Sequence, residues 1–218
     1  MDAMVLKTQQ YLNTNYGGDS RYEIIEEDGL TGWATIYALT RAFQIELGIT
    51  ATADSFGPTT ERLFKERYPN GIKQQADGDE TTSRVYAIIQ GALWCKGYST
   101  GSWDITEHFY NGTGSGVREL KHDAGYEDPD STVTLNVMKA LLSMNQYVTI
   151  YSQGGTSQIR SIQQQLNRKY EEYIGLIPCD GLYGREMCRA LILVLQAIEG
   201  FSVSDATGNF GEQTKSRC

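Results

Sequence analysis

Histidines and paired carboxylates are the first places to look for catalytic chemistry in this chain. His108 and His122 do not have the spacing of zinc ligands, and Glu107-His108 lacks the second histidine of an H-E-x-x-H motif. A glycosidase needs two carboxyl groups about 5 to 9.5 Å apart across a cleft. The acidic run at residues 26–28 is available, but such runs are typical of solvated turns. Neither a G-x-S-x-G elbow nor a Walker-type phosphate loop is present. We therefore predict that the chain is not an enzyme and needs no metal or cofactor.

The four cysteines include no C-x-x-C pair of the kind that marks zinc or redox sites. Cys188 falls in an apolar helical stretch and is predicted to be buried. Cys179 precedes one predicted turn and Cys218 follows another, so a disulfide between them is one hypothesis. It would stabilise the fold by about 3 to 4 kcal/mol in the chain-entropy model and would indicate an oxidising environment. Two free thiols are the alternative.

The composition excludes several classes of partner. A net charge of −8 and a pI near 4.8 argue against nucleic acid and anionic lipid, which both select basic surfaces. No apolar run reaches the roughly 20 residues that cross a bilayer. The residues after Met1 do not have the pattern of a secretory signal. The 14 Tyr, 3 Trp and 6 Phe suit a partner that is held by stacking and hydrogen bonds.

The chain repeats itself, because motifs of its first 70 residues recur in the same order near its end. The matching positions are Gln9 with Gln163, Leu12 with Leu166, Asn13 with Asn167, Asp28-Gly29 with Asp180-Gly181, Gln44 with Gln196, Gly48 with Gly200, and Phe56-Gly57 with Phe210-Gly211. The middle of the chain carries a weaker copy that starts at Gln90. There the Asp-Gly turn is replaced by a Gly- and Thr-rich stretch at residues 104–116. Self-similarity at this period is typical of helical repeats.

Each repeat is predicted to hold three helices. In the first repeat, apolar residues at helical spacing predict a helix that ends at Gly17-Gly18. A second helix is predicted over residues 33–47, where Gly48 provides the C-terminal cap position. Pro58 predicts the first turn of a third helix that continues to about Tyr68. Polar linkers are predicted at residues 70–82 and 149–157.

The repeated pattern Gln-x-x-Leu, Asp-Gly-x-x-Gly, Gln-x-x-x-Gly and Phe-Gly-x-x-Thr resembles the bacterial peptidoglycan-binding domain. Motifs outside this repeated pattern, such as Gly32-Trp33 and Trp94-Cys95-Lys96-Gly97, resemble the N-terminal region of Gram-positive proteins that end in a glycoside-hydrolase-like barrel. No such barrel lies in this sequence. The resemblance implies an all-α fold of tandem three-helix units. These would be repeat 1 at residues 1–70, a degenerate repeat 2 at 80–148, and repeat 3 at 157–218.

In that family the ligand groove lies beside the Asp-Gly turn and the helix that follows it. Carried over to this sequence, the resemblance implies two sets of ligand-binding residues: Asp28, Gly29, Trp33 and Tyr37 in repeat 1, and Asp180, Gly181, Tyr183 and Arg185 in repeat 3. Aromatic faces could stack on sugars, and Asp or Arg could bond hydroxyls or carboxylates. Turn formation and helix packing alone would also explain these residue types.

Repeat 3 reaches Cys218 with its third helix barely begun. We therefore expect this helix to be truncated, the chain to be a fragment, and the region of Ile192, Val194 and Leu195 to be poorly covered.

The expected function is non-catalytic binding of peptidoglycan or a related cell-wall glycan, which would target an attached C-terminal glycoside-hydrolase-like domain of the same protein. The parent protein would then be a cell-wall glycoside hydrolase, located outside the cell or in the cell wall. A structural or protein-interaction array that does not bind glycan is the alternative.

Overall fold

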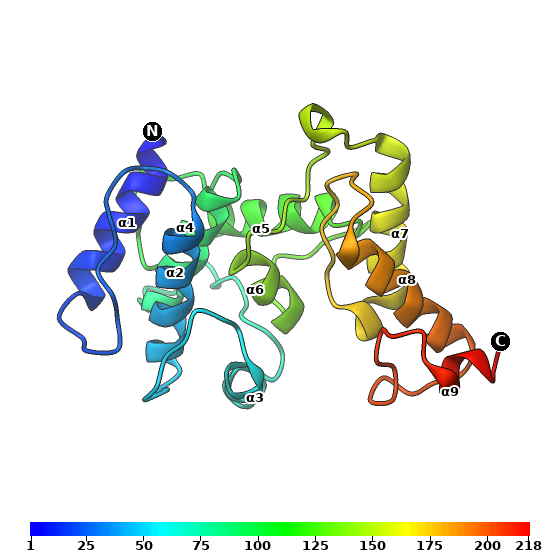
Figure 1. Cartoon of the computed structure of the whole chain (residues 1–218). Coiled ribbons are helices and arrows are strands. Elements are labelled where there is room, and N and C mark those ends of the chain that lie inside the picture. The colour runs from blue at the N-terminus through cyan, green and yellow to red at the C-terminus, as the bar shows by residue number, and fades with distance from the viewer. The chain divides into compact units, whose positions relative to one another are not determined.

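The computed structural model describes all 218 residues and is all-α, as the sequence predicts (Figure 1). Its elements are α1 (Ala3–Tyr16), α2 (Trp33–Glu46), α3 (Pro58–Arg67), α4 (Arg84–Cys95), α5 (Asn111–Asp123), α6 (Leu135–Leu141), the 3₁₀-helix η1 (Tyr151–Gln153), α7 (Ser157–Ile174), α8 (Arg185–Ile198) and α9 (Glu212–Lys215). None of these helices combines the length and the apolar character that crossing a membrane requires. The three helices expected in the first repeat are confirmed to within about a residue at each end.

The chain divides into two compact units. The first, which we call the N-unit, comprises Met1–Glu119 and Asp130–Met144, and the second, the C-unit, comprises Leu120–Pro129 and Asn145–Cys218. The boundary falls within α5, so the segment predicted as repeat 2 contributes to both units.

The core of the N-unit forms around α4, which contacts α1, α2 and α6 (Figure 1). Ile88, Ile89 and Leu93 of α4 are fully buried, and the helix is capped at its N-terminus by Ser83, whose side chain accepts a hydrogen bond from Val85 N. A Cβ atom on Gly91 would lie 2.5 Å from Thr8 Cγ2 of α1. The absence of a side chain at Gly91 therefore allows α1 and α4 to pack closely.

Helix α5 begins earlier than the Gly- and Thr-rich stretch suggests. Residues 111–116 are helical although they contain Gly112, Gly114 and Gly116. A Cβ on Gly112 would lie 2.1 Å from Thr100 O, and one on Gly116 would lie 2.7 Å from Ser99 O. Tertiary packing against the 97–103 loop thus outweighs the low helix propensity of glycine.

In the C-unit, α7 packs on α8 around Leu166, Ile177, Met187, Ala190 and Val194. The expectation that the middle of α8 is poorly covered is wrong for Val194, which is only 8% exposed. The exposed apolar side chains of α8 are Leu191 and Ile198 instead, which lie two helical turns apart.

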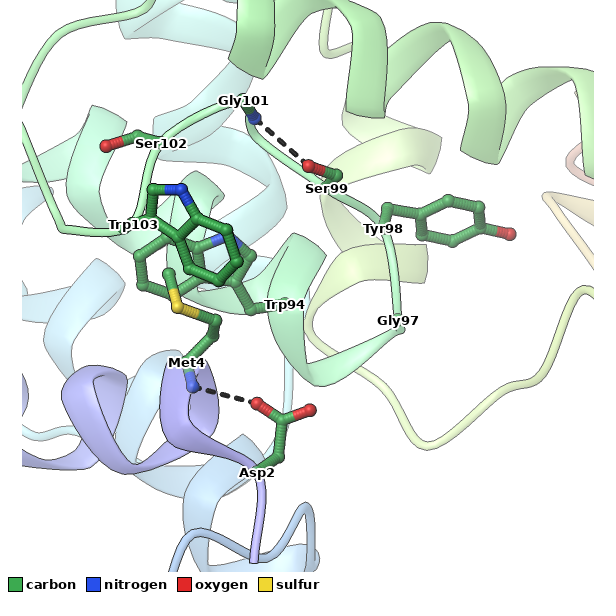
Figure 2. A pocket seen from close by; sticks show the side chains of 9 residues that line it. All are labelled: Asp2, Met4, Trp94, Gly97, Tyr98, Ser99, Gly101, Ser102 and Trp103. Carbon is green, nitrogen blue, oxygen red and sulfur yellow. Dashed lines mark hydrogen bonds between the residues drawn. The ribbon is translucent and has the colours of Figure 1, made fainter.

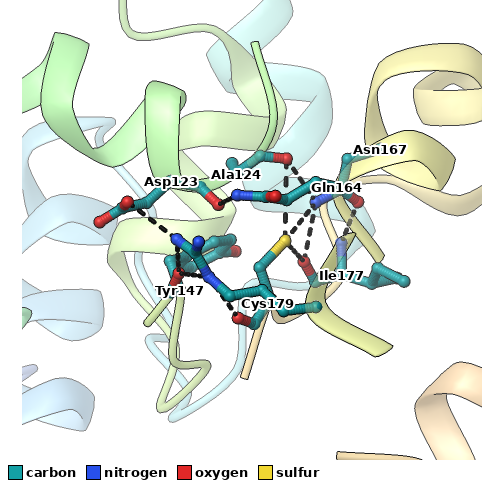
Figure 3. Close-up of polar contacts among 8 residues, drawn as sticks. Asp123, Ala124, Tyr147, Gln164, Asn167, Ile177 and Cys179 are labelled. Carbon is teal, nitrogen blue, oxygen red and sulfur yellow. Dashed lines mark hydrogen bonds and ion pairs between the residues drawn. The ribbon is translucent and has the colours of Figure 1, made fainter. Parts of the chain in front are cut away.

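A polar network joins the 120–129 segment of the C-unit to α7 (Figure 3). Arg160 pairs with Asp123 at 2.9 Å and donates to Tyr147 O and Cys179 O. Asn167 Nδ2 donates to Ala124 O and to Ile177 O, each at 3.0 Å, and lies 3.3 Å from Cys179 Sγ. Charge-assisted and fully buried bonds of this kind fix the geometry of a small core.

The cysteines are all free in this structure. Cys179 is completely buried in the network just described, whereas Cys218 is exposed, so the geometry favours two free thiols over the hypothetical disulfide. Cys188 is exposed on α8, which contradicts the prediction that it is buried. The apolar face of α8 is formed by Met187, Ala190 and Val194, and position 188 falls outside it.

Candidate ligand-binding groove

One buried glutamine organises the Asp-Gly turn of the C-unit. Gln163 Nε2 donates to Asp180 Oδ1 at 2.9 Å and to Leu182 O at 3.1 Å, while its Oε1 accepts from Gly181 N at 2.8 Å. Asp180 Oδ1 also accepts from Leu182 N at 2.9 Å. The turn is tied to the start of α7 by a bond from Thr156 N to Gly181 O at 2.9 Å. The side-chain amide of Gln163 is therefore fully used in holding the turn.

The N-unit contains the same arrangement at its first turn. Gln9 Nε2 donates to Asp28 Oδ1 at 2.8 Å, and Gly29 N donates to Gln9 Oε1 at 2.8 Å. Asp2 N, at the cap of α1, donates to Gly29 O at 2.8 Å. The bonds from Gln9 and from the backbone of Leu30 lower the pKa of Asp28 because they favour its charged form.

The middle segment keeps this turn without the Asp-Gly sequence. Gln90 Nε2 donates to Thr106 Oγ1 at 2.9 Å and to His108 O at 2.8 Å, and Ser83 N donates to Glu107 O at 2.9 Å. Glu107 has a φ of 53°, close to the 66° of Gly29 and the 75° of Gly181. Positive φ is uncommon for a residue with a side chain. A hydrogen bond from Tyr11 to Glu107 accompanies it. The sequence does not reveal this turn, because its residues differ from those of the two Asp-Gly turns. Its hydrogen bonds are nevertheless similar to theirs.

These contacts divide the eight candidate ligand-binding residues, which the sequence suggested, into two groups. Asp28, Gly29, Asp180 and Gly181 form the turns: both glycines are buried at positive φ, and both aspartates are bonded to the buried glutamines. Trp33, Tyr37, Tyr183 and Arg185 follow the turns. Three of these are exposed and Tyr37 is half-buried. The second group is therefore the one that is free to contact a ligand.

In the N-unit, Trp33 and Tyr37 form an aromatic pair on the first turns of α2. Their ring centroids lie 5.5 Å apart with an interplanar angle of 33°, and Trp33 is 57% exposed. The pair arises because residues i and i+4 share one face of a helix. It offers an aromatic surface for a flat apolar group.

In the C-unit, the Asp-Gly turn borders a hollow of about 220 Å³. Asp180 and Arg185 line it together with Gln163, Ile177 and Pro178. Tyr183, which is 62% exposed, is not among the lining residues. The structure thus brings Asp180 and Arg185 to one concave site.

A second hollow of about 190 Å³ adjoins the first, because Ile177, Pro178 and Glu186 line both. Arg189 and Leu193 of α8 extend its wall. We call the two hollows together the α8 groove. Its apolar lining residues include Ile177, Pro178 and Leu193, and the exposed Arg185, Glu186 and Arg189 also line it.

Sequence reasoning missed Glu186, Arg189, Ile177 and Pro178. The spacing of Glu186, Arg189 and Leu193 is i, i+3 and i+7, which places them on one helical face and was a usable signal. No comparable signal exists for Ile177 and Pro178. They reach the groove through the loop that Asn167 holds by bonds to both Ile177 N and Ile177 O.

Residues 152–218 match the family model described as "FadG/YbfG, PGDB-like domain". This segment carries the whole of the α8 groove except Asn145. The match supports a peptidoglycan-binding-domain-like, all-helical module for this part of the chain.

Two proteins of Bacillus subtilis (strain 168) are similar to the chain over nearly all of its length. The uncharacterized protein YbfG is 52% identical over 218 residues, which cover 100% of this chain and 28% of YbfG. The uncharacterized protein FadG is 47% identical over 217 residues, which cover 99% of this chain and 36% of FadG. The chain therefore spans about a third or less of these relatives. No solved structure matches it.

Proposed function

We propose that the chain is a non-catalytic module that binds peptidoglycan or a related cell-wall glycan through the α8 groove. The observation that carries the proposal is the concave site beside the Asp180 turn, which lies within the segment matched by the PGDB-like family model. In this proposal the Gln163-anchored turn is a rigid support for the groove.

The chemistry of the groove suits a glycan that carries short peptides. Arg185 and Arg189 provide exposed guanidinium groups that can bind peptide carboxylates in a bidentate manner. Glu186 can accept hydrogen bonds from amide or hydroxyl groups. Ile177 and Pro178 form an apolar floor on which methyl groups and sugar C–H faces can rest.

The proposal extends to the setting of the module. In the relatives, most of the protein lies outside the matched region. We propose that the module holds an attached domain of the same protein, of the glycoside-hydrolase type, at the cell wall, and that it acts outside the cell. We also propose that three helical units at residues 1–70, 80–148 and 157–218 underlie the chain.

Co-sedimentation with purified, insoluble peptidoglycan tests this function. The wild-type chain is expected to pellet with the wall material, and Arg185→Ala combined with Arg189→Ala is expected to reduce the pelleted fraction, because both side chains line the groove. Tyr151→Ala serves as the control, because Tyr151 is an exposed aromatic of η1 that lines neither hollow of the groove. A chain that stays in the supernatant, or a double variant that pellets like the wild type, would contradict the proposal. The turbidity of the wall suspension should stay constant, because no hydrolysis is expected.

A structural or protein-interaction array is the second candidate function. It is favoured by the exposed apolar side chains of the C-unit, among them Leu191 at 36% exposure, Ile198 at 65% and Phe210 at 49%. Exposed apolar residues that share a face are typical of contact surfaces. This candidate predicts that Ile198→Asp changes association with an attached domain and leaves pelleting with peptidoglycan unchanged.

A further inference from the structure

The N-unit contains a hollow of about 400 Å³ that lies outside the features described so far. The residues of its lining that matter here are Asp2, Met4, Trp94, Ser99, Ser102 and Trp103. Figure 2 shows the Trp103 ring and the Met4 side chain in front of the Trp94 ring, and all three residues line the hollow. Two tryptophans out of the three in the chain therefore meet at one cavity.

Trp94 stands where repeats 1 and 3 have an asparagine, four residues after the buried glutamine. Asn13 and Asn167 each bind both backbone groups of a following loop residue, Ile25 and Ile177 respectively. Trp94 instead is 6% exposed and donates from Nε1 to Thr100 Oγ1 at 3.0 Å. In the middle segment, an aromatic residue that lines the hollow therefore stands in place of the asparagine that bonds a loop in the other two repeats.

Trp103 has an exposed side chain on a loop whose backbone is held by hydrogen bonds. Its side chain is 85% exposed, the largest exposed fraction among the three tryptophans. Lys7 donates a hydrogen bond to Trp103 O and lies 3.6 Å from the Asp104 carboxylate. Ser102 Oγ accepts from Asp104 N at 3.1 Å and donates to Asp104 O at 2.9 Å. An exposed indole is costly in water, and these bonds hold the backbone from which the Trp103 ring projects, so less of the loop has to be ordered when the ring stacks on a ligand.

The polar groups of the hollow define which ligand fits. Asp2 is the one charged residue of the lining, and the neighbouring Lys7–Asp104 ion pair adds no net charge, so an anion is disfavoured. Ser99 and Ser102 offer hydroxyl groups beside the aromatic faces. Aromatic rings flanked by hydroxyls and one carboxylate suit a neutral, flat ring with C–H groups on its faces and hydroxyls at its edge.

We propose that this hollow is a binding subsite for a neutral pyranose sugar, which stacks on Trp103 and whose hydroxyl groups donate hydrogen bonds to the Asp2 carboxylate and to the hydroxyl oxygens of Ser99 and Ser102. The subsite is independent of the α8 groove, because its residues all belong to the N-unit. An experiment can therefore contradict the pyranose subsite without contradicting peptidoglycan binding by the α8 groove, and an experiment on the α8 groove leaves the subsite assignment unaffected. A pyranose can come from a glucan or from an N-acetylated glycan, and the two sources are separated by the probes below.

Tryptophan fluorescence of the full chain tests the proposal with cellotriose and chitotriose as separate probes. The measurement uses Trp33→Phe as background, so that only Trp94 and Trp103 report. We expect a saturable change in emission with at least one trisaccharide, and Trp103→Ala in the same background should weaken the affinity measured by calorimetry about tenfold or more. Binding of chitotriose alone would assign the subsite to N-acetylated sugars, and binding of cellotriose with equal affinity would assign it to the ring face itself.

Two further variants keep the outcome decisive. Asp2→Asn should weaken binding, whereas Tyr151→Ala, the control for the aromatic truncation Trp103→Ala, should leave it unchanged. Circular dichroism spectra and melting temperatures close to those of the background would show that loss of binding is not loss of folding. Absence of binding by both trisaccharides, or binding that Trp103→Ala leaves unchanged, would overturn the proposal.

Discussion

Gln163 and Asp180 are joined by a hydrogen bond of 2.9 Å from Nε2 to Oδ1, and Gln9 and Asp28 are joined in the same way at 2.8 Å. In both turns the glutamine lies on the first helix and the aspartate precedes the second. A buried side-chain amide thus sets the direction in which the following helix starts. The candidate ligand residues Trp33 and Arg185 take the first positions of those helices.

Gln163→Leu should destabilise the chain by about 2 to 4 kcal/mol. The substitution leaves Gly181 N without its partner and removes two donations, and unpaired buried polar groups are costly. Urea unfolding followed by circular dichroism measures the change. Gln165→Leu is the matched control on the exposed side of α7 and should shift the free energy of unfolding by less than about 0.5 kcal/mol. Equal effects of the two variants would contradict the role of Gln163.

Gly181→Ala should also be strongly destabilising, by about 2 kcal/mol or more. Gly181 has a φ of 75°, and an added Cβ would lie 2.5 Å from Thr156 O. Gly184→Ala is the control, because no atom lies within 4 Å of its added Cβ and its φ of −116° suits any residue. Thermal unfolding of both variants tests this prediction. A Gly181→Ala variant as stable as the wild type would show that the turn is not constrained as described.

The sequence predicted the all-α class, the helices of the first repeat and the Asp-Gly turns, because periodicity and turn residues are local signals. It did not predict that the middle turn is retained, since Glu107 replaces glycine there at positive φ. Nor did it predict the start of α5, where glycines are helical because neighbouring backbone packs against them. The α8 groove was found only in part, because Ile177 and Pro178 enter it through tertiary contacts.

Lys96 should make stability depend on pH. Burial lowers the pKa of Lys96 to about 7, whereas an unfolded lysine titrates near 10.4. Between these values the unfolded chain holds a proton on Lys96 that the folded chain lacks, so the contribution of Lys96 to the free energy of unfolding rises as the pH increases from about 7 to 10. Lys96→Met should flatten this rise, which one group can contribute at up to about 1.4 kcal/mol per pH unit. Parallel pH profiles of both proteins would contradict the prediction.

Thiol labelling should distinguish two pairs of cysteines. Burial raises the pKa of Cys95 to about 11 and that of Cys179 to about 12, and both side chains are enclosed. Cys188 and Cys218 are exposed. Mass spectrometry after brief alkylation should therefore find two labels on the folded chain and four after denaturation. A total of only two labels on the denatured chain, in the absence of reductant, would instead indicate a disulfide.

The most direct test of the α8 groove is a titration of the ¹⁵N-labelled chain with soluble peptidoglycan fragments, followed amide by amide by NMR. The account predicts that the largest chemical-shift changes fall on residues 176–189, around Ile177, Asp180, Arg185 and Glu186. Arg185→Ala should reduce these changes at equal fragment concentration. A spectrum that the fragments leave unaltered, or changes that avoid residues 176–189, would contradict the assignment of the groove as the glycan-binding site.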